Sequence, residues 1–159
     1  MRTTKIEWTD KTWNPITGCT KYSDGCAHCY AETMAHRLKA MGVKKYSQGF
    51  ALTLHEDSLL EPLKWKKAHN IFVCSMSDIF HKDVPFSFID KIFDIITRTP
   101  QHRYQILTKR EAIMAEYFST RKVPHNVWLG VTVEKKDNLN RIDVLRNIPA
   151  AVHFLSCEP

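Results

Sequence analysis

Three of the five cysteines in this 159-residue chain fall within one short stretch. Cys19, Cys26 and Cys29 are spaced C-x6-C-x2-C, and the turn-forming run Ser23-Asp24-Gly25 lies between the first two. The amino terminus has no apolar run typical of a signal peptide, so we expect a cytoplasmic protein whose thiols stay reduced. In that compartment a tight cysteine cluster indicates a metal site rather than disulfides.

Two kinds of metal centre suit three thiolates in one loop. Zinc needs a fourth ligand, which His28 could supply, although zinc sites usually draw their ligands from two separated pairs. A [4Fe-4S] cluster would bind the three cysteines on three irons and leave the fourth iron open. We expect Cys74, inside an apolar run, to be a core residue, whereas Cys157 falls just after the last expected strand. The cysteine spacing therefore agrees with both a zinc site and an iron–sulfur cluster.

The elements that must position this loop alternate between strands and helices. The apolar patterns predict strands at 12–18, 50–54, 71–76, 104–108, 127–133 and 151–156. Helices are expected at 27–41, in the segment that follows residues 55–57 up to about 67, between Pro85 and Pro100, at 111–118 and at 138–146. Such an alternation favours a parallel sheet with right-handed crossovers. Such a sheet is either open and doubly wound or closes toward a barrel, and in both cases we predict one α/β domain over residues 1–159.

Polar clusters follow nearly every expected strand. In parallel sheets, function gathers at the carboxyl ends of the strands, where these clusters would share one rim. The first cluster is the segment from Gly18 to Tyr30 with its three cysteines, which we call the cysteine loop. The others are His55-Glu56-Asp57, Ser75-Met76-Ser77-Asp78, Thr108-Lys109-Arg110, Thr132-Val133-Glu134 and Ser156-Cys157-Glu158. We expect Trp13 and Trp128 to be core residues.

Three cysteines in a loop after the first strand of a βα chain resemble the layout of radical S-adenosylmethionine enzymes. The chain departs from their common C-x3-C-x2-C pattern by its wider first gap, and Tyr30 follows the third cysteine. A narrower resemblance, to the phage- and prophage-associated three-Cys-motif proteins of unknown function, runs the length of the chain. It is carried by Thr12-Trp13-Asn14-Pro15, Gly18-Cys19, Ser23-x-Gly25-Cys26-x-x-Cys29-Tyr30-Ala31, Ser75-Met76-Ser77-Asp78-Ile79-Phe80, Leu107-Thr108-Lys109-Arg110, Leu129-Gly130-Val131-Thr132-Val133-Glu134 and Leu155-Ser156-Cys157-Glu158-Pro159.

This resemblance implies a partial (βα)6 TIM-like barrel of radical-SAM type, with a [4Fe-4S] cluster on Cys19, Cys26 and Cys29. It also implies S-adenosylmethionine at the open iron, cleaved with an electron from an external donor to act on an unknown substrate. Some members have a separately encoded partner protein. Members are usually longer, with a further strand, so we expect this chain to be a truncated or split member.

The resemblance also suggests ligands for the cofactor after the second and third strands. Glu56 would pair with the ammonium group of the methionine moiety. Ser75, Ser77 and Asp78 would hydrogen-bond the ribose or the substrate, although the same residue types also cap turns.

Charged residues after the later strands complete the expected site. Lys109 and Arg110 would bind the cofactor carboxylate or a phosphate of the substrate. Basic residues at the start of a helix oppose its dipole, which favours a functional reason for this pair. Glu134 and Glu158 would face the same opening, with Glu134 in contact with the cofactor.

The charge of the chain hints at a polyanionic partner. Its net charge of +6 arises from 23 basic and 17 acidic residues, which are scattered rather than gathered in one run. A zinc-stabilised module that binds nucleic acid or a partner protein, without catalysis, is therefore the alternative function. A third alternative is a degenerate or truncated relative of these enzymes, in which the cluster only stabilises the fold. No stretch approaches the roughly 20 apolar residues that cross a bilayer, so no membrane partner is expected.

Overall fold

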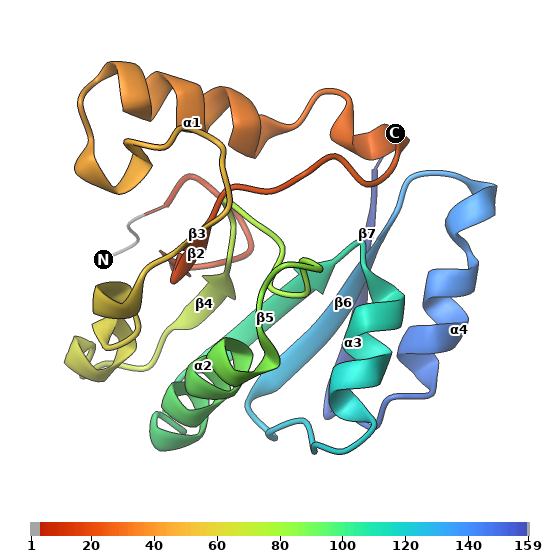
Figure 1. The fold of residues 1–159 in the computed structure, drawn as a ribbon. Coiled ribbons are helices and arrows are strands. Elements are labelled where there is room, and N and C mark those ends of the chain that lie inside the picture. Colours follow the sequence, from red (N-terminus) through yellow and green to blue (C-terminus); the bar gives the residue numbers. More distant parts are fainter. Residues whose placement is uncertain (1–3, 159) are drawn as a thin grey trace.

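The computed structural model describes residues 4–158, which are built around a five-stranded parallel sheet (Figure 1). Its strands stand in the order β1-β4-β5-β6-β7. They are β1 (Lys11–Trp13), β4 (Asn70–Val73), β5 (Arg103–Thr108), β6 (Val127–Val133) and β7 (Val152–Cys157). Each pairs in parallel with its neighbour. The strands run across the sheet in chain order, as they do around a (βα) barrel. The predicted α/β class with a parallel sheet is confirmed.

The main sheet has five strands and not the six that we predicted. The expected strand at 12–18 is interrupted at Asn14-Pro15, and its second half forms β2 (Ile16–Thr17). This β2 pairs antiparallel with β3 (Thr53–Leu54) in a separate two-stranded sheet. Proline has no N–H for a sheet ladder, and Asn14 Oδ1 accepts a hydrogen bond from Met76 N, so the chain leaves the main sheet there. The carboxyl end of β3 therefore does not belong to the common rim.

The helix predicted to end near residue 67 is also wrong. That segment forms two single turns of 3₁₀-helix, η3 (Glu56–Ser58) and η4 (Glu61–Lys64), with Pro62 inside the second. Short 3₁₀ turns serve as connectors, and these two bring the chain back to the start of β4. Similar turns occur at η1 (Asp24–Cys26), η2 (Lys44–Tyr46) and η5 (Lys136–Asn138).

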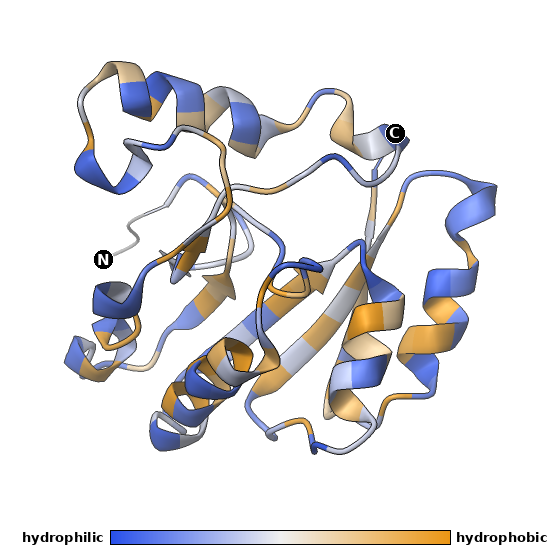
Figure 2. Ribbon diagram, in the orientation of Figure 1, coloured by the Kyte–Doolittle hydropathy of each residue, from blue (hydrophilic) through white to orange (hydrophobic). Residues whose placement is uncertain are grey.

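Three helices cover one face of the main sheet: α2 (Phe86–Arg98), α3 (Glu111–Phe118) and α4 (Asn140–Arg146) (Figure 1). The hydrophobic residues of α2 recur along one side of the helix (Figure 2), and Ile89, Ile92 and Ile96 are fully buried. They pack against the alternate residues of each strand that point to the same side, such as Tyr104 and Ile106 of β5. Trp13 is fully buried in this core as expected, whereas Trp128 is only half-buried.

The remaining helix, α1 (Tyr30–Ala40), lies apart from this layer, beyond the carboxyl ends of the strands (Figure 1). It has a small hydrophobic cluster of its own with Tyr46 and Met76. The cysteine loop leads into it, since Cys29 precedes its first residue. Among residues 4–158, no helix has both the length and the apolar character needed to span a membrane.

Candidate functional site

A cavity of about 520 Å³ opens at the carboxyl ends of the main-sheet strands. The cysteine loop lines one side of it, with Cys19, Cys26 and Cys29. The strand ends line the other, through Cys74, Ser75, Ser77, Asp78, Leu107, Thr108, Lys109, Arg110, Thr132, Ser156 and Glu158. Aromatic side chains complete the wall: Trp8, Tyr22, Tyr30, Phe50 and Phe72. The fold thus brings residues from four strand ends to one opening with the three thiols.

All three loop cysteines are free thiols of intermediate exposure. Burial and the nearby Asp78 carboxylate raise the pKa of the Cys19 thiol, and the Arg110 guanidinium partly opposes this effect. In the part of the chain that the structure describes, no group of three or more His, Cys, Asp or Glu side chains could hold a metal ion. The donors therefore share a cavity without forming a closed mononuclear site.

Arg110, which is buried, holds the cysteine loop from the end of β5. Its Nη2 donates to the carbonyl oxygen of Thr20 at 3.1 Å and to Thr20 Oγ1 at 3.2 Å. The guanidinium also lies over the ring of Tyr22, 4.6 Å from its centroid. His81 Nε2 also hydrogen-bonds with Thr20 Oγ1, at 2.9 Å. Burial and the positive charge of Arg110 lower the pKa of His81.

Asp78 is buried and joins the ends of β4 and β5. Its carboxylate accepts hydrogen bonds from Thr108 Oγ1 at 2.7 and 2.8 Å, from Lys109 N at 3.1 Å and from Phe80 N at 2.9 Å. These three donors use most of the acceptor capacity of the carboxylate within the protein. Ser77 donates its hydroxyl to the carbonyl oxygen of Gly18, at the start of the cysteine loop.

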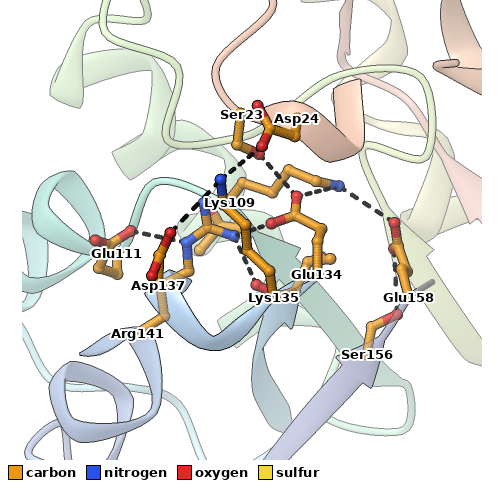
Figure 3. A network of polar contacts seen from close by, with 12 residues as sticks. Ser23, Asp24, Lys109, Glu111, Glu134, Lys135, Asp137, Arg141, Ser156 and Glu158 are labelled. Atoms are coloured by element: carbon orange, nitrogen blue, oxygen red, sulfur yellow. Dashed lines mark hydrogen bonds and ion pairs between the residues drawn. The ribbon is translucent and has the colours of Figure 1, made fainter. Parts of the chain in front are cut away.

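A polar network connects the ends of β5, β6 and β7 with the loop (Figure 3). At its centre, Glu134 Oε2 accepts a hydrogen bond from Arg141 Nη1 at 3.0 Å, and Oε1 accepts one from Ser23 Oγ at 2.7 Å. Both charged side chains are almost completely buried, at 4% and 3% exposure. Lys109 Nζ lies 3.9 Å from Glu134 Oε1 and 3.7 Å from Glu158 Oε2. Because these contacts of Lys109 are longer, its ammonium group is less tightly held than the buried side chains of Glu134 and Arg141.

Two predicted site residues do not line the cavity: Glu134, which lies in the network just described, and Glu56. Glu56 follows β3, which belongs to the small antiparallel sheet, and it does not line the opening. Its carboxylate forms an exposed ion pair with Lys91 of α2, with Oε1 2.7 Å from Nζ. Ser75, which does line the cavity, donates its hydroxyl to Asn14 Oδ1 at 3.1 Å.

Sequence reasoning missed Thr20, His81 and Arg141. For Arg141 a signal existed, because a helix that buries Leu145 places the residue four positions earlier on the same face. A charged residue at such a position calls for a buried partner. Thr20 and His81 carried no comparable signal, because their contact joins residues 61 positions apart in the chain.

A protein-family model described as "Protein of unknown function (DUF5131)" matches residues 3–159. No curated protein matches the chain. Among solved structures, a mutant of spore photoproduct lyase is 17% identical with a TM-score of 0.66, over 99% of this chain and 47% of that one. Another mutant of that lyase, with bound AdoMet and dinucleoside spore photoproduct, is 16% identical with a TM-score of 0.61, over 92% of this chain and 44% of that one. These likenesses show the fold, and this chain spans less than half the length of the lyases.

Proposed function

Because the chain belongs to DUF5131, a family of unknown function, we propose its function from the site itself. We propose an iron–sulfur protein of the radical S-adenosylmethionine kind, which cleaves S-adenosylmethionine reductively to act on an unidentified substrate. The observation that carries the proposal is that Cys19, Cys26 and Cys29 line one cavity at the carboxyl ends of a barrel-like sheet. The lyase of the same fold whose structure contains AdoMet gives independent support.

The residues at the cavity suit a cluster better than zinc. Zinc sites usually draw their four ligands from two separated pairs, whereas this loop offers one close pair, Cys26 and Cys29, with Cys19 before it. In a four-iron cluster each thiolate binds a different iron, so the thiolates stand farther apart than ligands of one ion. Three free thiols beside open space therefore fit a [4Fe-4S] cluster with one iron left accessible. Bound there, it would supply the electron for reductive cleavage.

The protein's own residues divide into those that are free to bind a ligand and those already engaged. Arg110, Asp78 and Glu134 are buried with protein partners, which favours a role in shaping the cavity over a role as cofactor ligands. Lys109 and Glu158 line the opening with longer contacts and partial exposure. We propose Lys109 as the group that binds an anionic part of the cofactor or the substrate.

The test is to purify the whole chain without air, reconstitute it with iron and sulfide, and measure iron, absorbance and 5′-deoxyadenosine. We expect about four irons per chain, a brown colour that dithionite bleaches, and 5′-deoxyadenosine formed from added S-adenosylmethionine. Cys26→Ala should lose all three signals. Cys157→Ala is the matched control, because that cysteine is exposed and does not line the cavity.

The contrary result is a colourless wild-type protein that carries one zinc per chain under the same conditions. It would replace this proposal by the zinc-stabilised binding module. The activity needs an external electron donor, which dithionite replaces in the assay. We propose a cytoplasmic setting for it, since free thiols and such donors belong to reducing compartments.

A further inference from the structure

The six residues between Cys19 and Cys26 are tied to the ends of two main-sheet strands. Thr20 binds Arg110 and His81, and two guanidinium groups lie near the Tyr22 ring. Arg110 Cζ is 4.6 Å from its centroid, and Arg141 Cζ is 5.9 Å from it. The first half of the loop is therefore fixed against β5 and α4.

The second half of the loop meets the end of β6. Ser23 Oγ donates to Glu134 Oε1 at 2.7 Å, and Lys135 Nζ lies 2.6 Å from Asp24 Oδ2 at the exposed rim (Figure 3). Gly25 packs against the Glu134 side chain so closely that a Cβ there would lie 2.4 Å from Glu134 Oε1. The wide first gap of the cysteine motif thus has a structural reason, because these residues span the distance to β5 and β6.

Glu134 is itself held from the side opposite to the loop. Arg141 Nη1 binds both Glu134 Oε2 at 3.0 Å and the carbonyl oxygen of Thr132 at 2.7 Å, and its Nε lies 3.4 Å from Glu111 Oε2. A carboxylate with one oxygen on a buried guanidinium and the other on the loop has little freedom to reorient.

We propose that Glu134 is a positioning residue for the cysteine loop: fixed by Arg141, it holds Ser23 and Gly25 so that the thiols of Cys19 and Cys26 face the cavity in a set relative position. This inference rests on the proposed function, because it says how the protein prepares the same thiols for a cluster. It differs from the role expected from the sequence, in which Glu134 contacts the cofactor.

The first test uses the whole chain without metal and follows backbone hydrogen exchange in peptides that cover residues 19–30. Glu134→Gln should speed exchange in this loop by on the order of tenfold, because the neutral amide has one acceptor oxygen and cannot accept from both Ser23 and Arg141. Glu111→Gln is the matched control, since it removes a carboxylate from the same Arg141 and touches no loop residue in the network. It should lower thermal stability while leaving exchange in the loop unchanged. Equal loop exchange in Glu134→Gln and wild type would overturn the proposal.

A second set of variants tests the contact directly. Gly25→Ala should speed exchange in the loop of the wild-type chain, because its Cβ would strike Glu134. In a Glu134→Ala background the same substitution should have no further effect, since the obstructing side chain is gone. If Gly25→Ala speeds loop exchange by the same factor in the wild-type chain and in Glu134→Ala, Glu134 does not position the loop.

The cluster provides the last readout and separates the two proposals. After reconstitution, Glu134→Gln should bind less iron and give an altered electron paramagnetic resonance signal, whereas Glu111→Gln should match the wild type. An unchanged signal in Glu134→Gln counts against positioning. If wild-type protein binds no iron at all, the proposed function fails, and the metal-free exchange experiments still decide the role of Glu134.

Discussion

At the scale of single residues, the gathering of the three cysteines at the carboxyl ends of the strands could be predicted from the sequence, while the contacts of their neighbours could not. The metal chemistry of the cysteines stays a prediction. Arg110 and Glu134 were expected to contact the cofactor, yet each has a protein partner in the loop. Those partners lie 90 and 111 positions away in the chain, a separation that no local pattern encodes. Whether any of these residues also contacts a cofactor stays a prediction.

The buried guanidinium of Arg141 should matter most for stability. Arg141→Met would leave the carboxylates of Glu134 and Glu111 without their buried counter-charge. Removing one partner of a buried pair typically costs about 3–5 kcal/mol, so we expect the free energy of unfolding to fall by about that amount. Urea denaturation of the metal-free chain measures it.

Arg146→Ala is the matched control for that experiment. Its side chain is 73% exposed and pairs with Asp143 at the surface, where an ion pair contributes little. We expect a change of less than about 1 kcal/mol. If both variants unfold at the same urea concentration, the buried network does not stabilise the fold in the way described.

At the scale of elements, long periodic segments were predicted well and short ones were not. The strands β5 and β6 and the helix α3 fall where the apolar pattern places them, because each repeats its pattern several times. The strands β2 and β3 have two residues each, too few to show whether they join the main sheet. The 3₁₀ turns η3 and η4 resemble a helix in composition, and only their contacts reveal the difference.

One of these turns is held by a histidine that should make the fold sensitive to acid. His102 is buried, its Nε2 lies 3.2 Å from the carbonyl oxygen of Pro62 in η4, and its ring stacks on His69. Burial lowers the pKa of His102, and the backbone carbonyls of Pro62 and Trp65 partly oppose this. Burial and the nearby Lys11 also lower the pKa of His69, while Asp10 opposes that shift.

These lowered pKa values set the direction in which folding stability changes with pH. Below about pH 6.5 the unfolded chain binds protons on these histidines that the folded chain does not, so stability should fall with the pH from there. Measuring the urea midpoint between pH 8 and 5 would show this decline. His102→Gln should make the decline shallower, and His125→Gln, at an exposed position, should not. Parallel curves for wild type and His102→Gln would contradict the assignment.

At the scale of the whole molecule, the two sheets and the cysteine loop meet at Gly18. Its N–H donates to the carbonyl oxygen of Met76, beyond β4, at 3.0 Å, and the next residue, Cys19, donates to the carbonyl oxygen of Phe50, before β3, at 3.2 Å. Gly18 has a φ of +80°, and a Cβ there would lie 2.2 Å from the carbonyl oxygen of Ala51. The sequence predicted one continuous strand through this junction, because a close approach between distant backbones leaves no local trace except the glycine.

Gly18→Ala should therefore cost more stability than a positive φ alone explains. Gly42 is the matched control, since it has a φ of +74° and nothing lies within 4 Å of where its Cβ would be. Gly42→Ala should cost about 1–2 kcal/mol for its conformation, and Gly18→Ala should exceed it by a further 1–3 kcal/mol, roughly, for the clash. Equal losses of unfolding free energy would show that the two backbones are not in close contact.

The distance along the chain between the loop and its anchors sets an order of events during synthesis. Ser23 cannot reach Glu134 until 111 further residues have been made and β6 has formed. At about 5–20 residues per second, the three thiols would leave the ribosome roughly 5–20 s before the surface that orders them exists. A metal bound by these thiols, as proposed, would therefore be delivered after β6 has formed, and a chain that stops before β6 would carry the three thiols in a loop that lacks its contact with Glu134.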